Sequence, residues 1–110
     1  MADIQEKRKS TRIQYSASIE IVSGTFKNFA LILNISIGGV GIESEGMLSI
    51  GESYIFEFTV GNDIKIKTKG DVKWGFKKEN THVYGVEFKD LSIFTKMKLD
   101  KFINQQSGKP

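Results

Sequence analysis

The stretch that decides the fold is Tyr54-Ile-Phe-Glu-Phe-Thr-Val-Gly-Asn-Asp-Ile-Lys-Ile-Lys-Thr68. On both sides of Gly61-Asn-Asp63, most apolar residues alternate with polar or charged ones. Such alternation is typical of a strand with one buried face, and a short glycine-containing turn joins the strands of a hairpin. The stretch therefore predicts two antiparallel strands, the second of which continues to about Trp74.

The same two-residue period recurs before and after this hairpin. It predicts further strands at residues 13–21, 26–33, 40–43 and 83–88. Short strands with frequent turns predict a small antiparallel barrel or sandwich. Asp90 or Ser92 is expected to cap a final helix that carries an apolar stripe to about Gln105 and covers an open end or face of the sheet.

Composition limits the chemistry that the chain can perform. A chain of 110 residues with a net charge of +3 is expected to form one domain. It has no cysteine, and the lone histidine, His82, is predicted in a polar loop that begins at Lys77. Because nucleophilic triads and zinc sites need more of these residues, we expect no enzyme, no metal and no cofactor. No apolar run approaches the ~20 residues of a membrane span, so no membrane insertion is expected.

Only two of the 16 basic residues are arginines, and they lie close together at Arg8 and Arg12. Residues 1–12 lack apolar periodicity, and they are predicted to form a flexible arm. Two guanidiniums at this spacing can converge on one ligand, one on a guanine edge and the other on a phosphate. Lys7 and Lys9 would add attraction. The alternative is a basic segment that binds nothing.

A second motif, Asn34-x-Ser36-x-x-Gly39, interrupts the strand pattern. Asn34 can hold a turn or bind a base, and the Ser36 hydroxyl can donate to a phosphate oxygen. Gly38 and Gly39 allow the backbone to approach a ligand closely. The alternative is a turn that the side chains cap without any ligand.

The two motifs, in this order, resemble the signature of the PilZ domain family. The similarity extends through Asn34–Ser44, Val72–Trp74 and Gly85–Ser92, and it covers roughly residues 7–105. It implies an all-β fold with a C-terminal helix, namely a six-stranded antiparallel β-barrel. The implied organisation is an arm at residues 1–12, the barrel and helix at 13–105, and a tail at 106–110.

The resemblance also implies a ligand, the bacterial second messenger cyclic di-GMP. Arg8 and Arg12 would clamp its guanine and phosphate groups from the arm, while Asn34, Ser36 and Gly39 would contact it from the barrel. Further contacts are expected from Gly38 and from Lys7, Lys9, Gly41 and Trp74. For Trp74 the alternative is a partly buried strand residue on the same face as Ile64 and Val72.

By this resemblance the chain is expected to be a cytoplasmic receptor. The nucleotide would order the arm, and a protein effector in motility, pilus or exopolysaccharide control would recognise the new surface. One alternative is an adaptor of the same fold that binds its partner without nucleotide. Another is a nucleic-acid-binding barrel, suggested by Lys65, Lys67, Lys69 and Lys73, but their face lacks stacking aromatics, so neither DNA nor RNA is expected.

Overall fold

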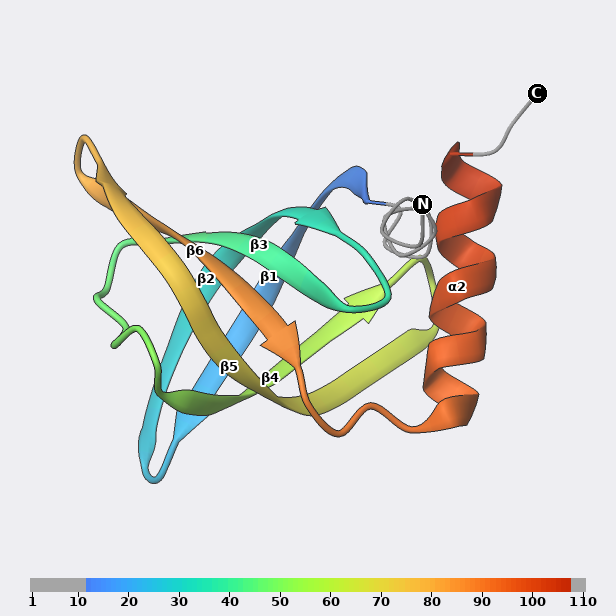
Figure 1. Cartoon of the computed structure of the whole chain (residues 1–110), viewed down its shortest axis with the longest axis horizontal. Helices are drawn as coiled ribbons and strands as arrows, with labels where there is room; N and C mark the ends of the chain where they lie inside the picture. The colour runs from blue at the N-terminus through green and yellow to red at the C-terminus, as the bar shows by residue number, and fades with distance from the viewer. Residues whose placement is uncertain (1–11, 108–110) are drawn as a thin grey trace, which may run out of the picture.

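A computed structural model describes residues 12–107 of the chain. In this range the backbone forms six strands followed by a helix, as predicted (Figure 1). The elements are β1 (Ile13–Ser23), β2 (Phe26–Ile35), β3 (Gly39–Ser44), β4 (Ser53–Val60), β5 (Ile64–Lys78), β6 (Thr81–Phe88) and α2 (Ile93–Ser107). Of the predicted arm at residues 1–12, only Arg12 belongs to the described residues, whereas Lys7, Arg8 and Lys9 lie outside them.

The strands close into a barrel in the order β1-β2-β3-β6-β5-β4, and every neighbouring pair is antiparallel. Pairing of Glu20, Ile21 and Val22 in β1 with β4 completes the ring. Because the sheet closes on itself, each of the six described strands has a neighbour on both sides. The fold is therefore the six-stranded antiparallel barrel, and the sandwich is excluded.

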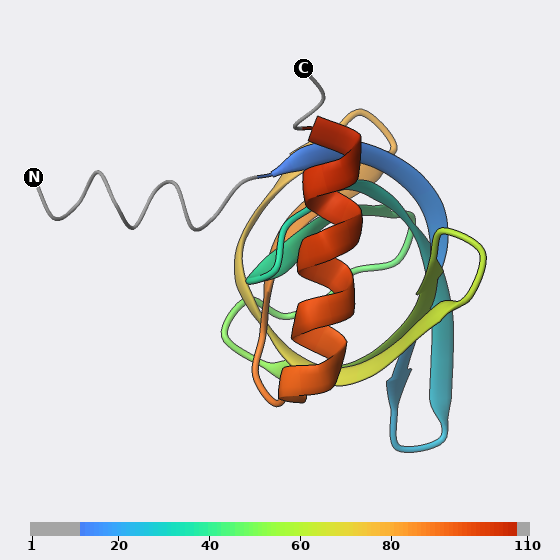
Figure 2. The same cartoon turned by 90° about the vertical axis from the view of Figure 1, so that its right-hand side faces the viewer.

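One side chain in every two along the strands points into the barrel and forms its core. Phe56 is the largest of the fully buried side chains. The other members with almost no exposure are Ile19, Ile21, Ile32, Ile35, Val40, Ile42, Val60, Val72, Leu99 and Ile103. Two of these, Leu99 and Ile103, come from α2, which lies across one open end of the barrel (Figure 2).

The terminal helix begins after one of the two predicted caps and ends slightly later than the sequence predicts. Ser92 is its cap, since the Ser92 Oγ accepts a hydrogen bond from the Thr95 backbone N–H at 3.2 Å. The helix continues to Ser107, two residues beyond the predicted end. Its predicted apolar stripe is only partly buried, because Phe94 and Met97 are exposed beyond the rim of the barrel.

The connection between β5 and β6 is a tight hairpin where the sequence predicts a loop. Lys78 pairs with Thr81, so only Glu79 and Asn80 form the turn. Glu79 has a φ of 52°, a left-handed conformation that a hairpin of this kind needs. Since glycine usually supplies this conformation, the sequence gives no clear hairpin signal here.

His82 consequently lies in β6 and is not a solvated loop residue. Its ring stacks on Tyr84 with centroids 6.1 Å apart. Within the described chain the buried His82 Nδ1 has no hydrogen-bond partner. Tyr84 itself fixes the loop before β4, because its hydroxyl accepts a hydrogen bond from the Leu48 N–H at 2.8 Å.

Candidate functional site

A bulge in β2 turns Asn34 to the outer surface of the barrel. Ile32 pairs with Ile42, but Asn34 pairs with Gly41, so Leu33 is an extra residue between two regular pairs. Regular alternation would put Asn34 inside with Ile32, whereas the extra residue moves it to the other face. The bulge therefore places the Asn34 amide on the outer surface, beside β3.

A second bulge does the same for Trp74 in β5. Val72 pairs with Val86, but Trp74 pairs with Gly85, and Lys73 is the extra residue. The alternative that Trp74 shares the inner face with Val72 is therefore wrong. Its side chain lies outside and is 52% exposed.

Asn34 and Trp74 are the two ends of one cross-strand row on the outer surface. The pairs Asn34–Gly41, Gly41–Gly85 and Gly85–Trp74 connect β2, β3, β6 and β5. We call these four residues the Asn34 row. The two central residues must lack a side chain, since a Cβ at Gly41 would lie 2.8 Å from Asn34 Oδ1. A Cβ at Gly85 would overlap Trp74 Cε2, so each of the two outer side chains packs directly over a glycine.

The turn between β2 and β3 is held by Ser36, which is buried. Its Oγ accepts hydrogen bonds from the N–H groups of Gly38 and Gly39, both at 3.2 Å. Gly39 must be glycine, because a Cβ there would overlap the Val86 carbonyl oxygen. At Gly38, in contrast, the nearest atom to an added Cβ is Ser36 Oγ at 3.9 Å. The turn is therefore open at Gly38, while the Ser36 hydroxyl, which was predicted to donate to a phosphate, is buried and bonded within the turn.

Arg12, at the start of the described chain, reaches across to this surface. Its Nη1 donates a hydrogen bond to Asn34 Oδ1 at 2.5 Å. Partial burial lowers the pKa of the Arg12 guanidinium from its ordinary value, although an arginine stays charged at neutral pH. A fixed cation thus lies at the Asn34 end of the row.

These residues enclose a depression of about 270 Å³. Its lining contains Arg12, Ser36, Gly38, Gly39, Val40, Lys73, Trp74, Gly85, Val86 and Glu87. The structure thus brings together five of the predicted site residues, and Asn34 joins them through its bond to Arg12. Gly41 lies beneath Asn34 and does not line the depression.

Sequence reasoning missed five lining residues of this depression, namely the core residues Val40 and Val86 and the outer residues Lys73, Gly85 and Glu87. Gly85 provides the surface under Trp74. Lys73 and Glu87 form an ion pair with a separation of 3.5 Å beside it. Only the cross-strand register brings these residues to the site, so the local sequence carries no signal for them. The lysine could add a positive charge next to Arg12 if an anion displaced the carboxylate.

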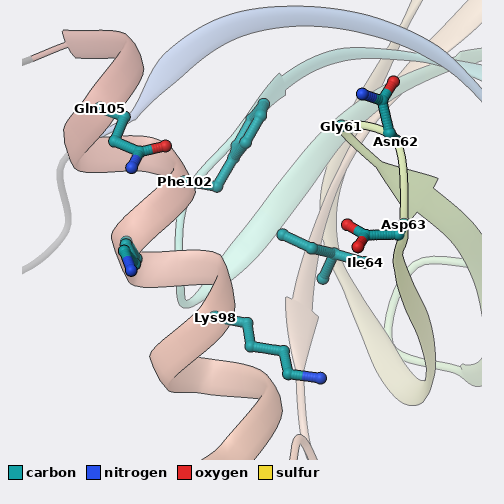
Figure 3. A pocket seen from close by; sticks show the side chains of 8 residues that line it. Gly61, Asn62, Asp63, Ile64, Lys98, Phe102 and Gln105 are labelled. Carbon is teal, nitrogen blue, oxygen red and sulfur yellow. The ribbon is translucent and has the colours of Figure 1, made fainter.

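A separate groove of about 500 Å³ lies between α2 and the β4–β5 hairpin (Figure 3). The side chains of Lys98, Phe102 and Gln105 line it from the helix, facing Asp63 and Ile64 on the hairpin. It contains none of the predicted site residues, and it includes both an acidic and two basic side chains.

Residues 12–107 also lack two features that would bear on function. No cluster of three or more His, Asp or Glu side chains in this range is arranged to hold a metal ion. In the same range, the helix is too short and too polar to span a membrane.

Comparison with known proteins identifies the family. The model of the PilZ domain matches residues 6–105. No curated protein sequence matches the chain. Among solved structures, the Bacillus subtilis inhibitor of motility (MotI/DgrA) is similar, with a TM-score of 0.79 and 19% identity over 90% of this chain and 50% of that one.

Two structures of YcgR from Escherichia coli are also similar. The first, in complex with c-di-GMP, has a TM-score of 0.76 and 15% identity over 93% of this chain and 46% of that one. The second, its PilZ domain with c-di-GMP, has a TM-score of 0.71 and 14% identity over 94% of this chain and 99% of that one. The chain spans about half the length of the first two structures. With the family model matched over nearly all of its length, the chain belongs to the PilZ domain family.

Proposed function

We propose that the chain binds cyclic di-GMP in the depression beside the Asn34 row and acts as a receptor. The observation that carries the proposal is the convergence of Arg12, Asn34 and Trp74 from three separate segments on one surface. Two similar structures hold c-di-GMP, which supports the same ligand class here. In this proposal the chain performs no catalysis.

Each residue of the site fits one part of the ligand. The planar guanidinium of Arg12 can make two parallel hydrogen bonds to a phosphate or to guanine O6 and N7. The exposed face of Trp74 offers a stacking surface for a guanine, since every base has a π-face. Gly38 and Gly39 let the phosphates approach the turn, and Asn34 offers an amide beside them. Arg8 would complete the clamp from outside the described residues.

The same geometry suggests how a signal is produced. Arg8 and Arg12 would bind the nucleotide together, so the segment that carries them would be fixed over the barrel. The resulting surface consists of arm, nucleotide and barrel, and a protein partner would recognise it. We place this receptor in the cytoplasm, where the nucleotide is made, and we assign it neither DNA nor RNA as a partner.

Calorimetric titration of cyclic di-GMP into the protein tests the proposal. Replacing Arg8 and Arg12 together by alanine should abolish measurable binding, because each charged hydrogen-bonding group contributes about 1.5–3 kcal/mol. The matched control is Lys65→Ala/Lys69→Ala, which removes the same charge from an exposed face of β5 and should retain the wild-type affinity. Unchanged binding in the arginine variant would refute the clamp.

Limited trypsin digestion tests the ordering of the arm separately. Nucleotide should slow cleavage after Arg8 and Arg12 more than cleavage after Lys89, an exposed residue in the connection between β6 and α2. Equal protection at both sites, or none, would contradict the proposed ordering. If the wild type binds no nucleotide at all, the adaptor of the same fold becomes the better account.

A further inference from the structure

A second row of side chains lies next to the Asn34 row on the outer surface of the same four strands. The pairs Leu31–Glu43, Glu43–Val83 and Val83–Phe76 run from β2 to β5. We call these residues the Leu31 row. Phe76 is 56% exposed, and its ring stacks on Trp74 with centroids 6.2 Å apart and an interplanar angle of 5°. The two rows therefore share a stacked aromatic pair.

Apart from Glu43, the Leu31 row is apolar, and it lies outside the barrel core. Val83 is only 7% exposed, yet it does not belong to the cluster of side chains inside the barrel. Phe29, two residues before Leu31 on the same strand, is 60% exposed. Large apolar side chains gathered on an outer sheet face are a common mark of a protein contact surface.

The β2 end of this surface contains a depression with apolar residues on one side and polar or acidic residues on the other. A depression of about 580 Å³ lies between Phe29 and Leu31 on one side and Glu43, Glu45 and Thr81 on the other. Glu43 is held in place, because its Oε2 accepts a hydrogen bond from Thr81 Oγ1 at 2.6 Å. Among the described residues that line the depression, two are carboxylates and none is a cation. This is an acidic surface on a protein whose net charge is +3.

We infer that this depression and the Leu31 row bind a segment of a partner protein that presents arginine or lysine next to apolar residues. The aliphatic stem of such a cation would pack on Phe29 and Leu31 while its head met the two carboxylates. An arginine would add a cation–π contact with Phe29. An anionic lipid surface or a nucleic acid is disfavoured, because the carboxylates repel phosphate.

The inference rests on the proposed function, because it names the chemistry of the partner that the receptor would address. Stacking of Trp74 on Phe76 makes the partner surface continuous with the nucleotide depression. A nucleotide resting on Trp74 would therefore border the segment that covers Phe76. Linkage then requires that each ligand changes the affinity of the other by the same factor.

The test uses the full chain labelled with ¹⁵N and a blocked eight-residue peptide of alternating leucine and arginine. Two control peptides have glutamate in place of arginine or glycine in place of leucine. We expect saturable shifts of the amide signals of Phe29, Leu31, Glu43 and Thr81 with the first peptide alone. Glu43→Gln/Glu45→Gln should weaken this binding about tenfold, the effect of removing hydrogen bonds to charged groups. Glu52→Gln, which removes an exposed carboxylate elsewhere, should not weaken it.

Three results would overturn the inference. They are the absence of saturable shifts, equal shifts with the leucine–glutamate peptide, and full affinity in Glu43→Gln/Glu45→Gln. A fourth contradicting result would come from sedimentation of the free protein. Self-association through Phe29 and Leu31 would mean that a second copy of the chain, and not a partner protein, covers this surface. Cyclic di-GMP is titrated into the same samples. If it fails to bind the wild type, the proposed function is refuted. The peptide shifts would still show whether the depression and the Leu31 row bind a basic, apolar segment.

Discussion

Replacement of Gly85 by alanine is expected to displace Trp74 from the outer surface of the barrel. The added Cβ would lie 2.2–2.5 Å from the Trp74 atoms Cε2, Nε1 and Cζ2, so the indole must move. Trp74 is 52% exposed, and about half of the roughly 200 Å² that a tryptophan can bury is thus covered. At about 25 cal/mol per Å², this packing contributes up to about 2.5 kcal/mol. Alanine in a strand regains about 0.5 kcal/mol relative to glycine, so we expect a net loss of about 2 kcal/mol.

A double-mutant cycle measures this coupling. In denaturant titrations followed by circular dichroism, Gly85→Ala should destabilise the wild type by about 2 kcal/mol. In a Trp74→Ala background the three nearest atoms to the new Cβ are gone, so the same change should be neutral or slightly stabilising. Equal destabilisation in both backgrounds would show that Gly85 does not act through Trp74. Nucleotide affinity should also fall, because a displaced Trp74 loses a stacking contact of about 1–3 kcal/mol.

Four further substitutions test other parts of the structure. Gly39→Ala should destabilise the barrel by about 3 kcal/mol in thermal unfolding, since its Cβ overlaps the Val86 carbonyl oxygen, whereas Gly38→Ala should change stability by less than about 0.5 kcal/mol. His82→Phe should leave stability unchanged or raise it by up to about 1 kcal/mol, because it removes an Nδ1 that has no hydrogen-bond partner among residues 12–107. A clear loss of stability would contradict this expectation. The hydrogen bond from Ser53 and the nearby Lys89 lower the pKa of Asp71. The ionised Asp71 therefore stabilises the fold fully above the ordinary aspartate pKa of about 4, and this stabilisation is lost as the pH falls through the lowered pKa. Ser53→Ala should therefore reduce the acid-dependent loss of stability in denaturant midpoints measured from neutral to acidic pH, and an unchanged pH profile would contradict this assignment.

The strands and the helix could be predicted because they follow local patterns. Alternation between Tyr54 and Thr68 shows which face of each strand is buried, and Gly61 marks a hairpin. The β5–β6 hairpin was not predictable in the same way, since Glu79 occupies the position where glycine would have been the signal. The partial burial of the helix was also hidden, because a stripe of apolar residues does not show where the barrel rim ends.

The site could be predicted only as a set of residues. The two motifs point to Arg12, Asn34 and Gly39, but the side chain of Asn34 faces outward only because Leu33 is an extra residue in β2. A single-residue bulge reverses the face of every following side chain, and no local pattern reveals it. Gly85 joins the site because it pairs with Gly41, more than 40 positions away in the chain. This pairing follows from the strand order of the closed barrel and leaves no local pattern in the sequence.

The intrinsic fluorescence of Trp74 tests most directly whether the nucleotide occupies the depression. Trp74 is the only tryptophan in the chain, so its emission reports this site alone. We predict a saturable change in emission on addition of cyclic di-GMP, with the affinity found by calorimetry and with no change in the Arg8→Ala/Arg12→Ala variant. Calorimetric binding without any change in Trp74 emission, or a change that persists in that variant, would contradict the account.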